Sequence, residues 1–110
     1  MAFKLTILTP EGKAFDGDVA SVTVPGVAGH FGVLTGHAPM VSALKAGLVK
    51  VSTESSECSH WVISGGVMEV GPAEAVILAD LALAAPNRID GEQKLEMLVT
   101  GNKALEPASW

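Results

Sequence analysis

The segment from Val24 to Pro39, with the sequence VPGVAGHFGVLTGHAP, constrains the fold more than any other part of the chain. It holds four glycines, two prolines and two histidines within 16 residues. Glycine permits positive φ angles and a close approach of backbones, and proline removes a backbone donor that a helix or an inner strand needs. The segment therefore cannot form a helix. It predicts turns around one short strand, His30–Leu34, at one end of a β-structure, where binding surfaces are common.

Alternating apolar and polar residues predict short strands over most of the chain. In Leu48–Thr53, for example, Val49 and Val51 face one side and Lys50 the other. Turn residues recur about every 8–12 residues without a helical period between them, as in antiparallel sandwiches. The other expected strands are Phe3–Thr9, Ala14–Asp16, Val19–Val24, Met40–Leu44, His60–Ser64, Val67–Val70, Ala75–Leu78 and Leu81–Ala84. We therefore predict a mainly β protein, an antiparallel β-sandwich of about eight to ten short strands.

One turn is expected early in this series. Gly17-Asp18 has the composition of a turn and separates two of the expected strands. In the strand that follows, the alternation places Val22 and Val24 on one face and Val19 on the other.

The pattern changes after Pro86. Asp90 can cap a helix, with Gln93 three residues later as its reciprocal partner. Gly101-Asn102 weakens the end of this helix. Three apolar residues follow the cap at helical spacing, namely Leu95, Leu98 and Val99. We predict a single helix of about three or four turns, with a sandwich domain over residues 1–86 and a short helical tail over residues 87–110.

Composition and charge exclude several classes of protein. A hydrophobic content of 48% excludes disorder, and a net charge of −5 argues against a nucleic acid or an anionic membrane surface as a direct partner. The single cysteine, Cys58, excludes a disulfide framework. The amino terminus lacks the features of a signal peptide, and the longest apolar run, Ala75–Ala85, is too short to span a bilayer. We expect a soluble protein that associates with a membrane only through a partner.

The residues that could carry chemistry do not form a recognisable site. His37 could act as a general base, but no motif supplies the orienting partner and the nucleophile that such a base needs. Ser64-Gly65-Gly66 lacks the preceding glycine of a nucleophile elbow. The spaced glycines match neither a phosphate loop nor a dinucleotide fingerprint, and Cys58 with His60 lacks the paired spacing of a zinc site. We expect no catalytic, nucleotide-binding or metal-binding residues and no cofactor.

Three stretches of the sequence together resemble one protein family. VTVPGVAGHFGVLTGHAPMVSALKAG, followed by WVISGGVMEV and AVILAD, is similar to the epsilon subunit of rotary F-type ATP synthases, which is called delta in mitochondria. The resemblance covers roughly Leu5 to Asp90. It implies a β-sandwich that works as a non-catalytic rotor subunit in the central stalk. Such a subunit links the gamma shaft to the membrane c ring and helps to couple proton flow to ATP synthesis at the alpha/beta hexamer.

The resemblance also implies where the partners bind and where the protein works. The surface facing the c ring would be the loop Val27–Leu34 together with His37, and the gamma interface would include Thr9 and Pro10. His30 stands at a position that is often acidic in relatives. The location implied is the cytoplasmic face of a bacterial plasma membrane, within the ATP synthase complex. The ring-facing residues expected from this resemblance are Val27, Ala28, Gly29, His30, Phe31, Gly32 and His37.

The tail departs from the family pattern. Members of the family end in two antiparallel helices, and some bind ATP through an Ile/Leu-Asp-x-x-Arg-Ala motif at the first helix. Here the motif begins with Ile89-Asp90, but Gln93 replaces the arginine and Lys94 the alanine. A neutral amide cannot replace the bidentate phosphate contact of a guanidinium. We therefore expect no specific ATP binding and little inhibition of hydrolysis by the tail.

Two other functions remain open on the residues alone. One is a β-sandwich that binds a small molecule or a carbohydrate without a protein partner. The other is a hydrolase that uses His37. Copurification separates these possibilities, because a rotor subunit should be isolated with gamma in stoichiometric amount.

Overall fold

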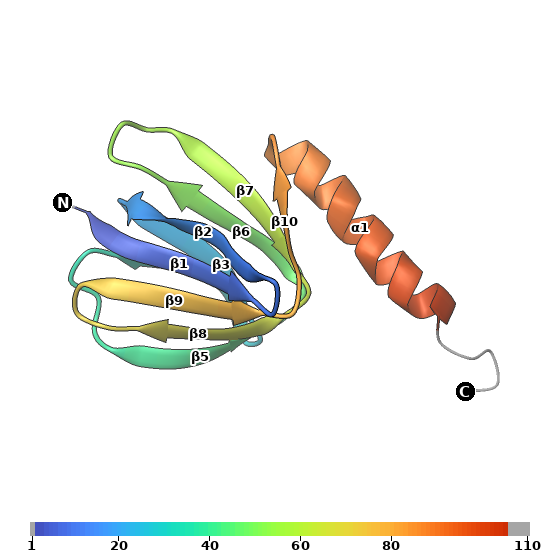
Figure 1. Cartoon of the computed structure of the whole chain (residues 1–110), viewed down its shortest axis with the longest axis horizontal. Helices are drawn as coiled ribbons and strands as arrows, with labels where there is room; N and C mark the ends of the chain where they lie inside the picture. Colours follow the sequence, from blue (N-terminus) through green and yellow to red (C-terminus); the bar gives the residue numbers. More distant parts are fainter. Residues whose placement is uncertain (1, 106–110) are drawn as a thin grey trace.

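The β-sandwich predicted from the sequence is confirmed. The computed structural model describes residues 2–105, which form ten strands followed by one helix (Figure 1). The helix, α1, spans Arg88–Leu105 and is the single helix expected after the strands. The strands are β1 (Phe3–Thr9), β2 (Gly12–Val19), β3 (Ser21–Gly26), β4 (Gly29–Leu34), β5 (Met40–Leu44), β6 (Gly47–Ser52), β7 (Cys58–Ile63), β8 (Gly66–Val70), β9 (Glu74–Ala79) and β10 (Ala82–Ala85).

The strands follow the order β10-β7-β6-β3-β5-β8-β9-β1-β2, and β4 pairs with β3. Strand β3 joins the two layers because Ser21–Thr23 pair with β6, whereas Gly26 pairs with Leu44 of β5. The layers visible in Figure 1 therefore share this strand. Neighbouring strands are antiparallel except β1 and β9, which run parallel from Lys4↔Glu74 to Leu8↔Leu78. This parallel pair was not expected from the sequence.

The core lies between the layers and is made of apolar side chains that alternate along the strands. In β1, for example, Phe3, Leu5 and Ile7 are buried while Lys4 is exposed. Val49 and Val51 of β6 are buried, as their alternation predicts. An edge-to-face contact between Phe15 of β2 and Trp61 of β7, with 6.1 Å between ring centroids, connects the two layers at their open side.

The predicted turn at Gly17-Asp18 is wrong. Both residues lie inside β2, which continues to Val19, and the chain breaks at Ala20 instead. The backbone N–H of Ala20 donates to the carbonyl oxygen of Ser52 at 2.7 Å, which fixes the break. Because the break shifts the alternation, Val19 and Val22 are both buried, although the sequence placed them on opposite faces.

The start of α1 also differs from the prediction. Asn87, rather than Asp90, caps the helix, because its Oδ1 accepts a hydrogen bond from the backbone N–H of Asp90 at 2.8 Å. Asp90 lies in the first turn, where its carboxylate is 3.3 Å from Nζ of Lys94. The helix has 18 residues, about 27 Å, and Gly101-Asn102 does not end it. The side chains of Leu98 and Val99, part of the expected apolar stripe, lie outside the described residues.

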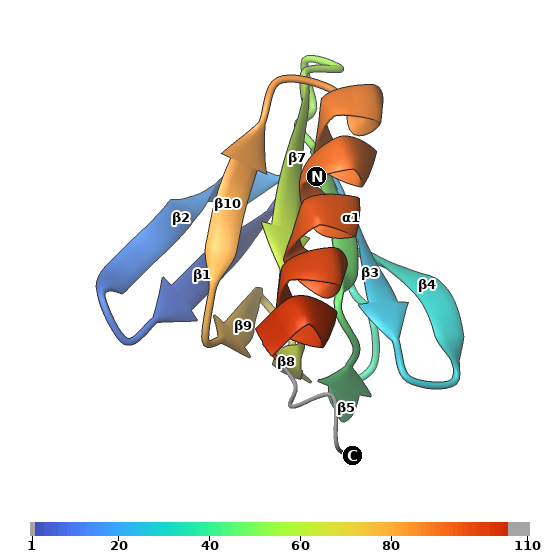
Figure 2. The ribbon, with the colours of Figure 1, turned by 90° about the vertical axis from the view of Figure 1, so that its right-hand side faces the viewer.

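Helix α1 packs on the outer face of β6, β7 and β10 (Figure 2). Gly91 is buried there, and a Cβ at this position would lie 2.5 Å from Cδ2 of Leu48 and 3.4 Å from Cβ of Ala85. The missing side chain thus permits the helix to approach the sheet closely. Lys94 adds a hydrogen bond from Nζ to the carbonyl oxygen of Ala84 at 2.9 Å. Within residues 2–105, no helix is both long and apolar enough to cross a membrane.

Candidate functional site

The hairpin formed by β3 and β4 presents most of the residues that were expected to face a ring. A two-residue turn, Val27-Ala28, joins the strands beyond the pair Gly26↔Gly29. The backbone N–H of Val27 donates to the carbonyl oxygen of Ala43 at 3.1 Å and holds the turn against the end of β5. Val27, Ala28 and His30 are exposed. The hairpin therefore offers a small, mostly uncharged surface at its turn.

The side chains of β4 alternate between the core and this surface. Val33 is buried, and Phe31 packs partly buried against the core. Phe31 therefore anchors the hairpin, whereas His30, Gly32 and Leu34 are exposed. Of the residues expected at the ring, Phe31 and His37 are half-buried and the others are exposed.

Two of the hairpin glycines are required for different reasons. A Cβ on Gly26 would lie 2.7 Å from the carbonyl oxygen of Gly29 and 2.9 Å from Cε1 of Phe31, so the ring of Phe31 packs directly over this glycine. Gly29 has open space around it but a φ of +136°, which L side chains rarely adopt. We expected at least one glycine of this segment at positive φ, and Gly29 and Gly36 confirm it.

Replacing Gly29 with alanine should lower the free energy of unfolding by about 1 kcal/mol, because alanine resists its backbone conformation. Gly32 lies in the same strand and is the matched control. A Cβ there meets its nearest neighbour, Oγ1 of Thr23, at 3.8 Å, an ordinary contact. Gly32→Ala should therefore be close to neutral. Urea denaturation of both variants measures the difference, and equal losses would contradict the role assigned to φ at Gly29.

His37 lies away from the hairpin turn. Its backbone N–H donates to the carbonyl oxygen of Leu34 at 3.1 Å, and its Nδ1 lies 2.8 Å from the carbonyl oxygen of Ala38. Leu34 pairs with Ser21 at the end of the hairpin opposite to Val27. The four residue steps from His30 to Leu34 span about 13 Å. The structure thus brings Val27–Gly32 together but leaves His37 at the other end of β4, in contacts that hold its own turn.

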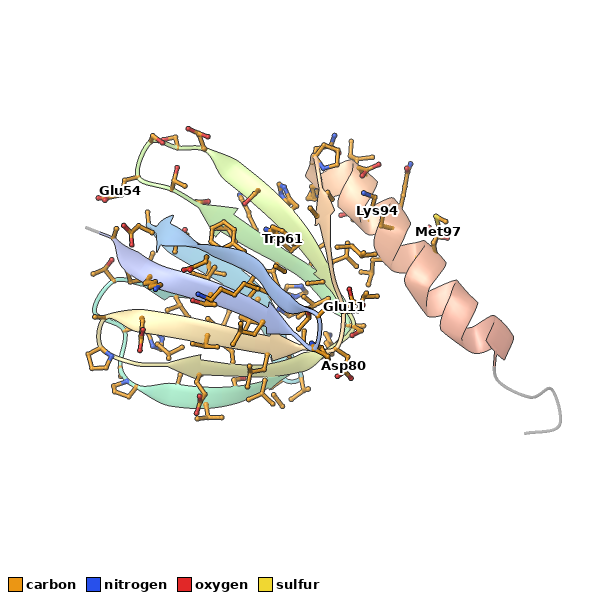
Figure 3. The ribbon with its side chains drawn as sticks, viewed as in Figure 1. Glu11, Glu54, Trp61, Asp80, Lys94 and Met97 are labelled. Atoms are coloured by element: carbon orange, nitrogen blue, oxygen red, sulfur yellow. The ribbon has the colours of Figure 1, made fainter. Side chains whose placement is uncertain are left out.

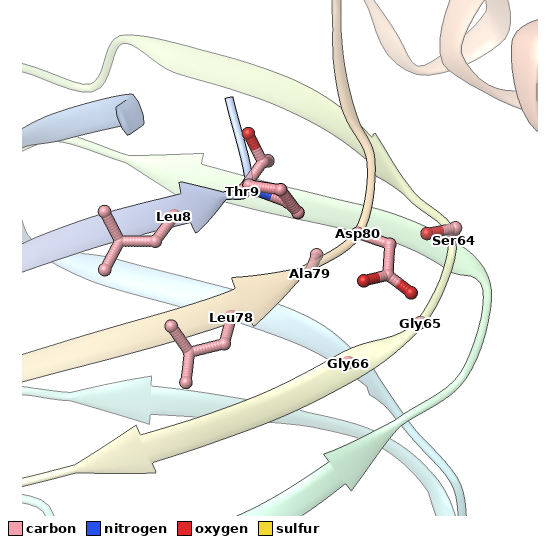
Figure 4. A pocket seen from close by; sticks show the side chains of 9 residues that line it. Leu8, Thr9, Ser64, Gly65, Gly66, Leu78, Ala79 and Asp80 are labelled. Atoms are coloured by element: carbon pink, nitrogen blue, oxygen red, sulfur yellow. The ribbon is translucent and has the colours of Figure 1, made fainter. Parts of the chain in front are cut away.

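Thr9 and Pro10, expected at the gamma interface, line a hollow of about 580 Å³ at the end of the sandwich (Figure 4). Thr9 shapes the turn after β1, since its Oγ1 donates to the carbonyl oxygen of Gly12 and accepts from the N–H of Glu11, both at 3.2 Å. The sequence did not predict the rest of the lining. The hollow is lined by Leu8, Thr9, Pro10, Ser64, Gly65, Gly66, Leu78, Ala79 and Asp80.

The hollow and the hairpin turn lie at the same end of the sandwich. Gly26, next to the hairpin turn, pairs with Leu44 of β5. Leu44 in turn pairs with Gly66, which lines the hollow. Two candidate contact surfaces are therefore neighbours. Among the residues that the structure describes, no three His, Cys, Asp or Glu side chains gather closely enough to hold a metal ion.

Comparison with known families decides the identity of the sandwich. Residues 2–85 match the family described as ATP synthase, Delta/Epsilon chain, beta-sandwich domain. The chain belongs to this family. The resemblance found in the stretch from Val22 to Gly47 and in the two stretches after it is thereby confirmed.

Relatives within the delta/epsilon family extend the match into the tail. The ATP synthase epsilon chain of Helicobacter acinonychis (strain Sheeba) is 39% identical over 106 residues, which cover 96% of this chain and 84% of that relative. The ATP synthase epsilon chain of Wolinella succinogenes is 37% identical over 102 residues, which cover 93% of this chain and 76% of that relative.

Two solved structures share the fold of this delta/epsilon family member. A chain of the Euglena gracilis mitochondrial ATP synthase, in a cryo-EM structure of OSCP/F1/c-ring, superposes with a TM-score of 0.73 at 21% identity, covering 96% of this chain and 82% of that chain. A chain of the Tetrahymena thermophila mitochondrial ATP synthase, from a central stalk/c-ring structure, gives a TM-score of 0.64 at 12% identity, covering 96% and 98%. At these identities the likeness concerns the fold.

Proposed function

We propose that this chain is a non-catalytic rotor subunit in the central stalk of an F-type ATP synthase. In this role it links the gamma shaft to the c ring and helps to couple proton flow to ATP synthesis. The observation that carries the proposal is the match of residues 2–85 to the delta/epsilon family. Its relatives at 37–39% identity are ATP synthase epsilon chains of bacteria. The corresponding location is the cytoplasmic face of a bacterial plasma membrane, within the complex.

The proposed contact with the c ring is the turn of the β3–β4 hairpin. Val27, Ala28, Gly29, His30 and Gly32 form its exposed surface, with Phe31 packed beneath them. A glycine-rich hairpin held by Phe31 and Val33 is stiff and yet allows the backbone of a partner to approach closely. These are the properties that a torque-bearing contact with a polar loop of the ring requires.

His37 is proposed as a turn residue rather than a catalytic base. Its two described contacts are with Leu34 and Ala38 of its own turn. A base for hydrolysis needs a group that orients it and a reacting atom within reach, and these contacts provide neither. The proposed function therefore assigns all ATP chemistry to other subunits of the complex.

Copurification tests the proposal. A tagged chain expressed in cells that make the whole enzyme should be isolated with gamma and the c ring in constant proportion. The control is the same tag on an unrelated β-sandwich. Isolation of the chain alone, with retention of a small molecule or a carbohydrate instead, would overturn the proposal and favour an independent ligand-binding module.

We propose two domains, a sandwich over residues 1–86 and a short helical tail over residues 87–110. The tail has lost the nucleotide contact of the family. Gln93 is exposed, whereas Lys94 donates a hydrogen bond to the carbonyl oxygen of Ala84 and forms an ion pair with Asp90. Isothermal titration with Mg-ATP should therefore detect no saturable binding. Ending the chain at Asn87 should change the hydrolysis rate of the assembled enzyme by less than about twofold, since a complete population shift needs several kcal/mol of differential binding. Saturable ATP binding, or a rate that rises several-fold on truncation, would contradict this view of the tail.

A further inference from the structure

Pro25 occupies the point where β3 passes from one strand partner to another. On one edge, β3 pairs with β6 through Thr23 and with β5 at Gly26. The carbonyl oxygen of Pro25 accepts a hydrogen bond from the backbone N–H of Lys45 at 2.9 Å. The N–H and C=O of a strand residue point to the same edge, so the donor that proline lacks would have pointed into this crossover. A residue without a donor therefore fits this position.

The ring of Pro25 packs into the space that Gly47 leaves at the start of β6. Gly47 is buried, and a Cβ there would lie 2.7 Å from Cβ of Pro25 and 2.9 Å from its Cγ. The φ of Gly47 lies outside the left-handed region. The backbone conformation therefore does not require glycine at this position, whereas the ring of Pro25 does. We call Pro25, Gly47 and the connection Lys45-Ala46 between β5 and β6 the hairpin root.

The hairpin root lies between the β3–β4 hairpin and the hollow. On one side, the connection Lys45-Ala46 is bonded to Pro25. On the other side, a Cβ at Gly65 would lie 3.3 Å from the carbonyl oxygen of Leu44 and 3.8 Å from the backbone nitrogen of Ala46. Leu44 also pairs with Gly66, and both Gly65 and Gly66 line the hollow. Close-packed backbone therefore supports the hairpin root from the side of the hollow.

The direction of the hairpin depends on the hairpin root. Among residues 2–105, β4 pairs with β3 alone, so no further strand supports the hairpin from its other side. Gly26 and the turn Val27-Ala28 follow Pro25 directly in the chain. A displacement of Pro25 would therefore tilt the turn, and with it the surface proposed to meet the ring.

We propose that Pro25 is a positioning residue, which sets the direction in which the β3–β4 hairpin meets the c ring by packing on Gly47. This inference rests on the proposed function, which assigns the hairpin surface to the ring. A contact that transmits torque needs a support that yields little. A proline ring with a fixed φ, packed against a glycine without a side chain, provides such a support.

Gly47→Ala tests the inference because the new Cβ would push against Pro25. Overpacking shifts the backbone. The N–H of Val27 donates to the carbonyl oxygen of Ala43 at 3.1 Å, and in the variant it should exchange with solvent at least about tenfold faster. Nuclear magnetic resonance of the full chain measures this exchange residue by residue.

The same variant should uncouple the enzyme without releasing the chain. In membrane vesicles stripped of the chain and reconstituted with Gly47→Ala, proton pumping per ATP hydrolysed should fall at least about twofold, because the hairpin is misdirected. The amount of chain bound to the vesicles should stay within about twofold of the unchanged chain, since the distant surfaces of the sandwich are not altered. A merely structural role would lower binding and pumping together.

Pro25→Gly provides the background in which the effect of Gly47→Ala should disappear. It removes both atoms that a Cβ at position 47 would meet. Added to Pro25→Gly, Gly47→Ala should speed exchange at Val27 by less than about twofold and cause no further loss of pumping, since the double-mutant cycle isolates this pair.

Gly71→Ala is the matched control. A Cβ there meets its nearest neighbour, the carbonyl oxygen of Glu74, at 3.5 Å, and its φ lies outside the left-handed region. In Figure 3, Asp80 marks the end of the sandwich that carries the hollow, and Glu54 marks the opposite end. Gly71 follows β8 at the end opposite to Gly66, far from the hairpin root. This variant should change exchange at Val27 and proton pumping by less than about twofold.

The outcomes separate this inference from the proposed function. Equal acceleration of exchange by Gly47→Ala in both backgrounds would mean that the ring of Pro25 does not hold the hairpin. Faster exchange with unchanged pumping would also overturn the inference, while the rotor function stands. If the unchanged chain restores no pumping to stripped vesicles, the rotor function itself is wrong, and this inference falls with it.

A second variant keeps the inference testable if circular dichroism shows that Gly47→Ala does not fold. Pro25→Gly alone empties the contact instead of overfilling it, and it frees the φ of residue 25. It should speed exchange at Val27 at least about threefold and lower pumping per ATP. Exchange and pumping equal to those of the unchanged chain would overturn the role assigned to Pro25.

Discussion

Replacing Gly66 with alanine is expected to lower the free energy of unfolding by about 3 kcal/mol or more. Gly66 begins β8 at a φ of +154° and pairs with Ala79 of β9. A Cβ there would overlap the carbonyl oxygen of Leu78 and lie 3.1 Å from Cα of Ala79. Because both neighbours are backbone atoms of a central strand, neither can move without breaking the pairing of β8 with β9. The substitution should also distort the hollow that Gly66 lines.

Gly12 is the matched control for this prediction. It also has a positive φ, +124°, but a Cβ there meets nothing within 4 Å. Gly12→Ala should therefore cost only the conformational strain, about 1 kcal/mol. Urea denaturation of both variants separates strain from overlap. Equal losses at the two positions would show that the close approach of β9 to Gly66 has no energetic consequence.

Replacing Ile77 with alanine is expected to cost about 2–5 kcal/mol, the range for removing a large aliphatic side chain from a packed core. Ile77 is fully buried, and its strand β9 lies between β8 and β1 near the middle of its layer. The cavity would open in the core between the two layers, where the close-packed side chains around it can collapse only in part. Thermal and urea denaturation should both show the loss, with the m-value unchanged.

Leu78→Ala provides the internal comparison, since Leu78 is the next residue along β9 and points to the outer face. It should cost less than about 1 kcal/mol of stability. A larger loss of stability at Leu78 than at Ile77 would mean that β9 faces the core in the opposite register.

The strands could be predicted from the sequence because their signals are local. The alternation around Val49 and Val51 extends over a few residues, and the predicted burial of both side chains is confirmed. The glycines of the Val24–Pro39 segment are an equally local signal, and the expected positive φ is confirmed at Gly29 and Gly36. The order of the strands depends on contacts between distant parts of the chain. The parallel pairing of Lys4 with Glu74 is of this kind. The break at Ala20 was missed because the shift that buries both Val19 and Val22 leaves no local mark in the sequence.

The helix shows a similar limit. Both Asn87 and Asp90 are good capping residues. Asp90 was favoured because Gln93, three residues later, completes a capping box with it. The structure selects Asn87. Gly91, which lowers helix propensity, is explained only by its position against Leu48.

Which of the expected site residues lie together could be predicted only in part. Val27–Gly32 are close in sequence and share the hairpin turn, but the sequence could not show that His37 lies at the other end of β4 from Val27. The apolar outer surface of β8 and β9 was missed because Val67 and Leu78 occupy the outward positions of their strands, where polar residues are expected. Apolar residues at both inward and outward positions of β8 and β9 are the signal that could have revealed it.

The most direct test of the rotor function is the coupling of ATP hydrolysis to proton pumping in membrane vesicles stripped of this chain. Adding the chain back in stoichiometric amount should restore proton pumping per ATP hydrolysed, while the isolated chain hydrolyses no ATP. Pumping that is equally coupled with and without the chain would contradict the account.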